Sequence, residues 1–149
     1  AGVIFSHAPS EFEQPVVEYG EKIGVAFQLV DDVIDLSTQP EKTGKVPGTD
    51  IKAGVVTLPL IYLRERAETD AASAALVERI DRGARDADAD ATDFEASVAE
   101  LRSHSATTDT LADAHRWARE AVEALAPLPK GPIKTALTRF ADSIVERSS

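Results

Sequence analysis

Three aspartates occur close together in an otherwise apolar stretch: Asp31, Asp32 and Asp35. On a helix, at about 100° per residue, they share one stripe with Gly24 and Gln28, and apolar residues fill most of the remaining circumference. Burying carboxylates without partners is costly, and no Lys or Arg lies on this stripe to compensate for their charge. We therefore expect the helix to be largely buried and its acidic stripe to face a cavity or a ligand that supplies positive charge.

The residue types of this stripe predict the kind of metal that it would bind. Carboxylate oxygens without His or Cys favour a hard cation, either Mg²⁺ or Ca²⁺. The sequence contains no cysteine, which excludes thiolate metal sites, disulfides and a cysteine nucleophile. Mg²⁺ typically takes one or two protein carboxylates and binds substrate phosphates as well. A metal-assisted reaction of a phosphorylated substrate is the chemistry that the motif predicts, with a solvated acidic surface as the structural alternative.

A long loop is expected after the aspartates, over residues 37–54. Its glycines and prolines are Pro40, Gly44, Pro47, Gly48 and Gly54. Loops of this length are often functional. Lys45 follows a glycine in this segment, and a mobile lysine there would be able to reach a metal-bound phosphate as a point charge. An exposed lysine without a binding role is the alternative.

The elements that must position these residues are helices. Apolar periodicity predicts helices over residues 14–37, 58–69, 71–82, 92–103, 108–125 and 132–147. A capping-box spacing starts the fourth of these at Thr92, after an acidic surface turn over residues 83–91. Trp117 and Phe140 are expected in the core. No strand alternation or linker divides the sequence, so we expect an all-α fold with residues 1–149 in one domain.

Composition limits the possible partners and the location. With 16 Lys and Arg against 26 Asp and Glu, the net charge of −10 makes nucleic-acid binding through general charge unfavourable. No apolar run reaches the roughly 18 residues of a spanning helix, and no signal peptide is evident, so a cytoplasmic protein is expected. The sequence contains no methionine and opens with an apolar run. We expect it to be a piece of a longer chain, the alternative being removal of a methionine before Ala1.

These motifs resemble one known family. The residues that carry the resemblance are Gly24-x-x-Phe27-Gln28-x-x-Asp31-Asp32-x-x-Asp35, Gly44-Lys45, Asp50 and Gly54-x-x-Thr57-Leu58-Pro59. Together they resemble the second aspartate-rich region of the trans-isoprenyl diphosphate synthases, or polyprenyl synthetases. The resemblance is specific over residues 20–59 and weaker towards the C-terminus. It implies a helical bundle of the isoprenoid synthase type, a homodimer, and two aspartate-rich motifs that hold Mg²⁺ across a cavity.

The resemblance also implies a reaction and a role for each residue of the motif. The reaction is the head-to-tail condensation of isopentenyl diphosphate with an allylic diphosphate. Asp31, Asp32 and Asp35 would bind Mg²⁺ in that reaction. Lys45 would be a catalytic residue that binds the allylic diphosphate, and Phe27 and Gln28 would be active-site residues beside the isopentenyl unit, with Gln28 binding substrate.

The sequence departs from the family pattern in two places. Val55 stands where the family often has lysine, and no other Asp-Asp-x-x-Asp motif occurs. We therefore expect the C-terminal portion of a synthase, unable to transfer prenyl groups by itself. The alternatives are a class I terpene cyclase and a non-catalytic partner subunit of a prenyl synthase. A cyclase normally carries an Asn/Asp–Ser/Thr–Glu second metal motif, and this difference favours the synthase.

Overall fold

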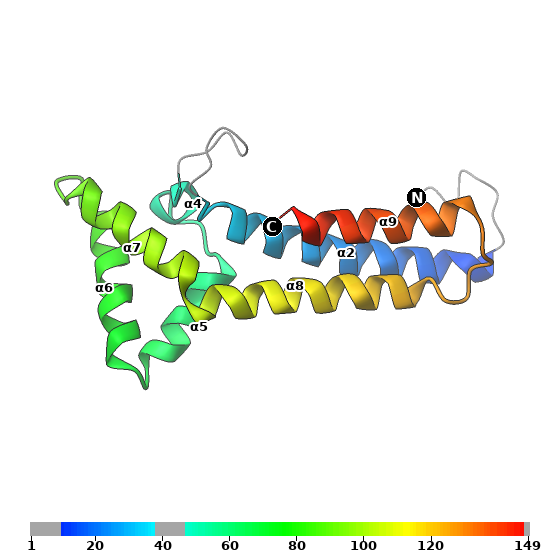
Figure 1. Cartoon of the computed structure of the whole chain (residues 1–149), viewed down its shortest axis with the longest axis horizontal. Helices are drawn as coiled ribbons and strands as arrows, with labels where there is room; N and C mark the ends of the chain where they lie inside the picture. Colours follow the sequence, from blue (N-terminus) through cyan, green and yellow to red (C-terminus); the bar gives the residue numbers. More distant parts are fainter. Residues whose placement is uncertain (1–9, 38–46, 148–149) are drawn as a thin grey trace. The chain divides into compact units, whose positions relative to one another are not determined.

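The computed structural model describes residues 10–37 and 47–147, and all regular structure within these ranges is helical. The elements in Figure 1 are η1 (Ser10–Phe12), α2 (Glu13–Ile34), α4 (Thr49–Lys52), α5 (Leu58–Ala67), α6 (Ala71–Arg85), α7 (Ala91–Ser103), α8 (Ser105–Ala124) and α9 (Pro132–Glu146). The all-α fold expected from the periodicity is thus confirmed. None of the described helices is both long enough and apolar enough to cross a membrane.

Several element boundaries differ from those expected, and side-chain caps explain two of them. α7 begins after Asp90, whose carboxylate accepts the Thr92 N–H at 2.8 Å, so Asp90 and not Thr92 is the cap. α8 begins at Ser105, where the Nδ1 of His104 accepts the Ala106 N–H at 3.0 Å. The expected loop contains the short helix α4, and the part of it that includes Lys45 lies outside the described residues.

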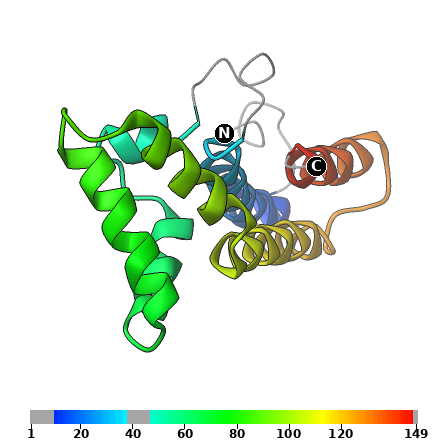
Figure 2. The ribbon, with the colours of Figure 1, turned by 60° about the vertical axis from the view of Figure 1, so that its left-hand side comes forward.

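The described residues form two compact units, whose boundaries fall within α2 and α8. Unit 1 comprises those up to Val30 together with those from Ala112 onwards, and unit 2 comprises those from Asp31 to Leu111. In unit 1, α9 lies alongside α2 and α8 (Figures 1 and 2). Its buried residues include Tyr19, Ile23, Ala26 and Val30 of α2, Ala114, Ala118 and Ala121 of α8, and Ala141 and Ile144 of α9.

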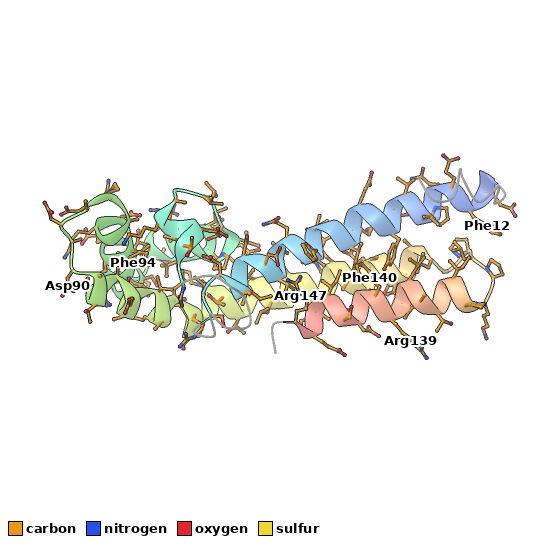
Figure 3. The ribbon with its side chains drawn as sticks, turned by 90° about the horizontal axis from the view of Figure 1, so that it is seen from above. Phe12, Asp90, Phe94, Arg139, Phe140 and Arg147 are labelled. Carbon is orange, nitrogen blue, oxygen red and sulfur yellow. The ribbon has the colours of Figure 1, made fainter. Side chains whose placement is uncertain are left out.

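The aromatic residues of unit 1 differ in burial: Tyr19 is buried, whereas Trp117 and Phe140 lie closer to the surface than their type suggested. The Tyr19 hydroxyl donates to the Leu137 carbonyl at 2.7 Å, and burial raises the pKa of this tyrosine. Trp117 is only half-buried, with the Lys22 ammonium 5.7 Å from its ring centroid. Phe140, on α9 in Figure 3, is 52% exposed, so its expected place in the core is wrong.

Unit 2 is organised around α6, which packs against α4, α5 and α7. The core consists of Leu36, Ile51, Leu60, Leu63, Leu76, Ile80, Phe94, Val98, Leu101 and Ala106. Phe94 lies directly against the backbone of α6, since a Cβ at Gly83 would be 2.6 Å from its Cδ2 atom. Gly83 is therefore a buried helical residue, and not part of the surface turn that the sequence predicted.

Gly83→Ala is expected to lower the free energy of unfolding by about 1–3 kcal/mol, because Phe94 must move to admit the methyl group. Gly20→Ala in α2 is the control, since a Cβ there meets nothing within 4 Å. That variant should gain about 0.5–1 kcal/mol from helix propensity. Urea denaturation of both variants measures the difference, and equal stabilisation by the two alanines would contradict the close packing of Phe94 on α6.

Candidate functional site

Two of the three motif carboxylates are buried in unit 2 and hydrogen-bonded to backbone amides. Asp32 is 6% exposed, and its Oδ2 accepts the N–H of Leu58, the first residue of α5, at 3.1 Å. Asp35 is 2% exposed, and its two oxygens lie 3.2 and 3.3 Å from the amide nitrogen of Asp50 in α4. These amides offset part of the cost of burying negative charge. The sequence had suggested that an external ligand supplies all of the compensating positive charge. In the structure, backbone amides supply part of this compensation.

The donor set fits a hard cation, although the described carboxylates are not gathered as a ready-made cage. Asp31 is half-buried, and no group of three or more acidic, His or Cys side chains in the described ranges is placed to hold a metal ion. Mg²⁺ needs only one or two protein carboxylates when substrate phosphates supply further oxygens. The residues present thus fit a metal that binds together with a phosphorylated ligand, and the prediction rests on that donor chemistry.

Phe27 and Gln28 belong to unit 1 and are both exposed on α2. Val25 of the same helix is also exposed, so the expected burial of the apolar circumference of α2 is wrong at Val25 and Phe27. The guanidinium carbon of Arg147, labelled in Figure 3, lies 4.7 Å from the Phe27 ring centroid. This distance is that of a cation–π contact, which attaches the residue after α9 to the Phe27 ring.

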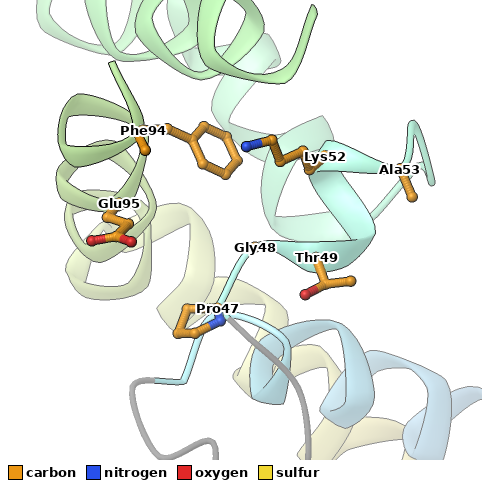
Figure 4. A pocket seen from close by; sticks show the side chains of 8 residues that line it. Pro47, Gly48, Thr49, Lys52, Ala53, Phe94 and Glu95 are labelled. Atoms are coloured by element: carbon orange, nitrogen blue, oxygen red, sulfur yellow. The ribbon is translucent and has the colours of Figure 1, made fainter. Parts of the chain in front are cut away.

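A cavity of about 410 Å³ lies in unit 2 beside the start of α4 (Figure 4). Its lining residues are Pro47, Gly48, Thr49, Lys52, Ala53, Ala91, Phe94 and Glu95. The Lys52 side chain extends towards the Phe94 ring, with Nζ 5.3 Å from the ring centroid. No sequence motif indicated this cavity, because its lining comes from two segments that are far apart in the chain.

Thr57, in the predicted Gly54-x-x-Thr57-Leu58-Pro59 motif, was not given a role from the sequence. It is 3% exposed at the N-cap of α5, yet its hydroxyl makes no capping bond and has no hydrogen-bond partner. The sequence did indicate the position of Thr57 as an N-cap, because this threonine precedes an apolar helix whose second residue is proline.

Thr57→Val is expected to raise the free energy of unfolding by up to about 1 kcal/mol, because it replaces an unpaired buried hydroxyl by a methyl group of similar shape. Thr110→Val is the control, since that buried hydroxyl donates to the Ala106 carbonyl at 2.9 Å. The control should cost about 0.5–1.5 kcal/mol. Thermal unfolding of the two variants gives the sign, and destabilisation by Thr57→Val would show that its hydroxyl is bonded in solution.

Ser73, His104 and Asp70 in unit 2 have the residue types of a nucleophilic site. Their hydrogen bonds, however, do not have the directions that such a site requires. Because Nδ1 of His104 accepts the Ala106 N–H, the proton of the neutral imidazole is on Nε2, 3.3 Å from Ser73 Oγ. The Ser73 hydroxyl donates to Asp70 at 2.6 Å. The imidazole is therefore not placed to take the serine proton, and the group caps helices instead.

Asp70, the N-cap of α6, makes the stability of the fold pH-dependent. Hydrogen bonds from the hydroxyl and the backbone amide of Ser73 hold the pKa of Asp70 below its usual range. The carboxylate therefore stabilises the fold above the unfolded-state pKa of about 3.9, and this is lost as pH falls through the lower folded-state value. We expect Asp70→Ala to lower Tm at neutral pH and to approach the unmodified chain once the pH falls below the lowered folded-state pKa of Asp70. A Tm difference that does not change with pH would contradict this.

Comparison with known proteins connects the motif with one family. The Polyprenyl synthetase family model matches residues 1–96. A nonaprenyl diphosphate synthase of Mycobacterium tuberculosis is 35% identical over 147 residues, which are 98% of this chain and 42% of that protein. An octaprenyl diphosphate synthase of Haemophilus influenzae is 32% identical over 149 residues, covering 99% of this chain and 43% of that protein.

The fold leads to the same group of proteins. The crystal structure of a polyprenyl synthase from Caulobacter crescentus, complexed with calcium and isoprenyl diphosphate, has a TM-score of 0.83 at 29% identity. The match covers 99% of this chain and 44% of that one. The chain thus spans less than half the length of these relatives, and its fold is that of the all-α isoprenoid synthases. On this evidence, the chain belongs to the polyprenyl synthetase family.

Proposed function

We propose that this chain forms the C-terminal part of a single polyprenyl synthetase domain that condenses isopentenyl diphosphate with an allylic diphosphate, head to tail. The observation that carries the proposal is the acidic motif at the end of α2, in a chain that shares its fold with a polyprenyl synthase complexed with calcium and isoprenyl diphosphate. The names of the relatives support a synthase over a terpene cyclase or a non-catalytic subunit.

The acidic motif that contains Asp31, Asp32 and Asp35 would hold Mg²⁺ in this reaction through one or two of its carboxylates. When bound, Mg²⁺ supplies positive charge that neutralises a diphosphate leaving group. The two buried carboxylates also fix the backbone around the motif, through the amides of Leu58 and Asp50. This arrangement keeps acidic oxygens in place before a ligand arrives, which reduces the reorganisation needed on binding.

The remaining roles follow the family resemblance. Lys45 would bind the allylic diphosphate and stabilise its departing charge. Phe27 and Gln28 would lie beside the isopentenyl unit, and Gln28 would contact it through its side-chain amide. An apolar surrounding excludes water that would otherwise trap an allylic cation. Homodimeric assembly and a cytoplasmic location are further parts of the proposal.

Metal-dependent ligand binding tests the proposal on the chain itself. Titration with farnesyl diphosphate, followed by calorimetry, should show binding in Mg²⁺ that weakens at least about tenfold when EDTA removes the metal. Farnesol, which has the same prenyl chain without the diphosphate, is the control and should not show this dependence. Binding that is absent, or unchanged by EDTA, would contradict the proposed function.

A further inference from the structure

Asp35 is attached twice to the turn that leads into α4. Its main-chain carbonyl accepts the N–H of Gly48 at 2.8 Å, and its carboxylate accepts the N–H of Asp50 at 3.2–3.3 Å. These residues belong to unit 2. Asp35 thus joins the end of α2 to the first turn of α4 through both its backbone and its side chain.

The opposite side of the same turn is held by α7. Gly48 has a φ of 79°, which favours glycine, and a Cβ there would lie 2.8 Å from Val98 Cγ2 and 3.3 Å from Phe94 Cε1. The turn therefore fits between Asp35 and the side chains of α7. Backbone bonds extend this fixed geometry along the chain, since Gly48 accepts the Lys52 N–H at 3.0 Å and Asp50 accepts the Val55 N–H at 2.9 Å.

The position of the Asp35 carboxylate suits a structural task better than direct metal binding. The side chain is 2% exposed, and both of its oxygens lie at hydrogen-bond distance from one amide. Asp31, by contrast, is half-buried. Because Mg²⁺ commonly takes one or two protein carboxylates, a motif of three leaves one carboxylate for another task.

We propose, on the basis of the proposed function, that Asp35 is a positioning residue: it holds the Gly48–Asp50 turn against the end of α2 and leaves metal contact to the rest of the motif. The acidic motif then has two parts. One part meets the metal and its diphosphate, and the other fixes the chain that follows the predicted Lys45 loop.

Amide hydrogen exchange tests the positioning role directly. Asp35→Ala removes the acceptor, so exchange of the Asp50 N–H should become at least about tenfold faster. Asp35→Asn keeps an acceptor oxygen within reach of the same amide and should restore slow exchange. Asp31→Asn is the matched control and should leave this amide unchanged. If Asp35→Ala exchanges at the original rate, the proposal is overturned.

Metal binding separates positioning from coordination, with Mn²⁺ and inorganic diphosphate as the probe. Asp31→Asn should weaken this binding at least about thirtyfold, whereas Asp35→Asn, which loses only a nearby charge, should stay within about fivefold. An equal loss in the two asparagine variants would make Asp35 a ligand and overturn the proposal. This comparison also decides the matter if Asp35→Ala does not fold. Absence of binding by the unmodified chain would instead contradict the proposed function, and the exchange rates of Asp35→Asn and Asp35→Ala would still test Asp35.

Discussion

Replacing Phe94 with alanine is expected to lower the free energy of unfolding by about 3–5 kcal/mol, the largest stability effect that we predict for a single residue. Phe94 is 5% exposed in the core of unit 2. Its ring approaches Gly83 of α6 and Gly48 before α4, so its loss leaves a cavity where three backbone segments meet. The Lys52 ammonium would also lose the ring that it faces.

Phe140→Ala is the matched control, since it removes the same side chain from the exposed face of α9. Because much of that ring already meets solvent, the expected cost is below about 1.5 kcal/mol. Urea denaturation of both variants measures the contrast. Similar costs at the two positions would mean that Phe94 does not close the core of unit 2 in solution.

Replacing Asp31 with asparagine is expected to weaken Mg²⁺-dependent binding of farnesyl diphosphate at least about thirtyfold, which corresponds to about 2 kcal/mol. The variant keeps the size of the side chain and removes its charge, and a hard cation depends on that charge. Asp31 is half-buried and lies at the end of α2, and thermal unfolding measures any change in Tm that accompanies its neutralisation. Calorimetry and thermal unfolding together separate the two effects.

Glu18→Gln is the control for this experiment. Glu18 also lies on α2, where it forms a partly exposed ion pair with Lys22 at 3.7 Å. The Glu18→Gln variant removes one negative charge from the same helix without altering the acidic motif, so Mg²⁺-dependent binding of farnesyl diphosphate should be unchanged. If both variants weaken binding equally, the effect is one of overall charge and Asp31 has no special part in it.

The sequence predicted the helices well because their signal is local. Apolar spacing places α5 and α9 within a few residues of their observed ends. The short helix α4 carries no such signal, since four residues do not complete a pattern, and its position depends on contacts with α6 and on Asp35. The start of α7 was misplaced because Asp90 and Thr92 are both good caps, and the structure uses the first of them.

The candidate site was predicted in its residue types but not in its hydrogen bonds. Spacing along one helix indicated that Asp32 and Asp35 share a face, and composition indicated a hard cation. Their amide partners lie 26 and 15 residues further along the chain, and no local pattern shows such pairs. The exposure of Phe27 and Phe140 could likewise not be predicted from the sequence, because residue type alone does not show which face of a helix a neighbouring element covers.

The way Phe94 fills the space beside two glycines has an evolutionary consequence. A side chain added at position 83 would occupy volume that the ring now uses, and the same holds for position 48. Substitutions at these sites should therefore be epistatic: Gly83→Ala should cost less in a background where Phe94 is already leucine than in the unmodified chain. Among homologues, positions 83 and 94 are expected to covary in volume, with a bulkier residue at one offset by a smaller one at the other, whereas position 48 should stay glycine because of its φ of 79°.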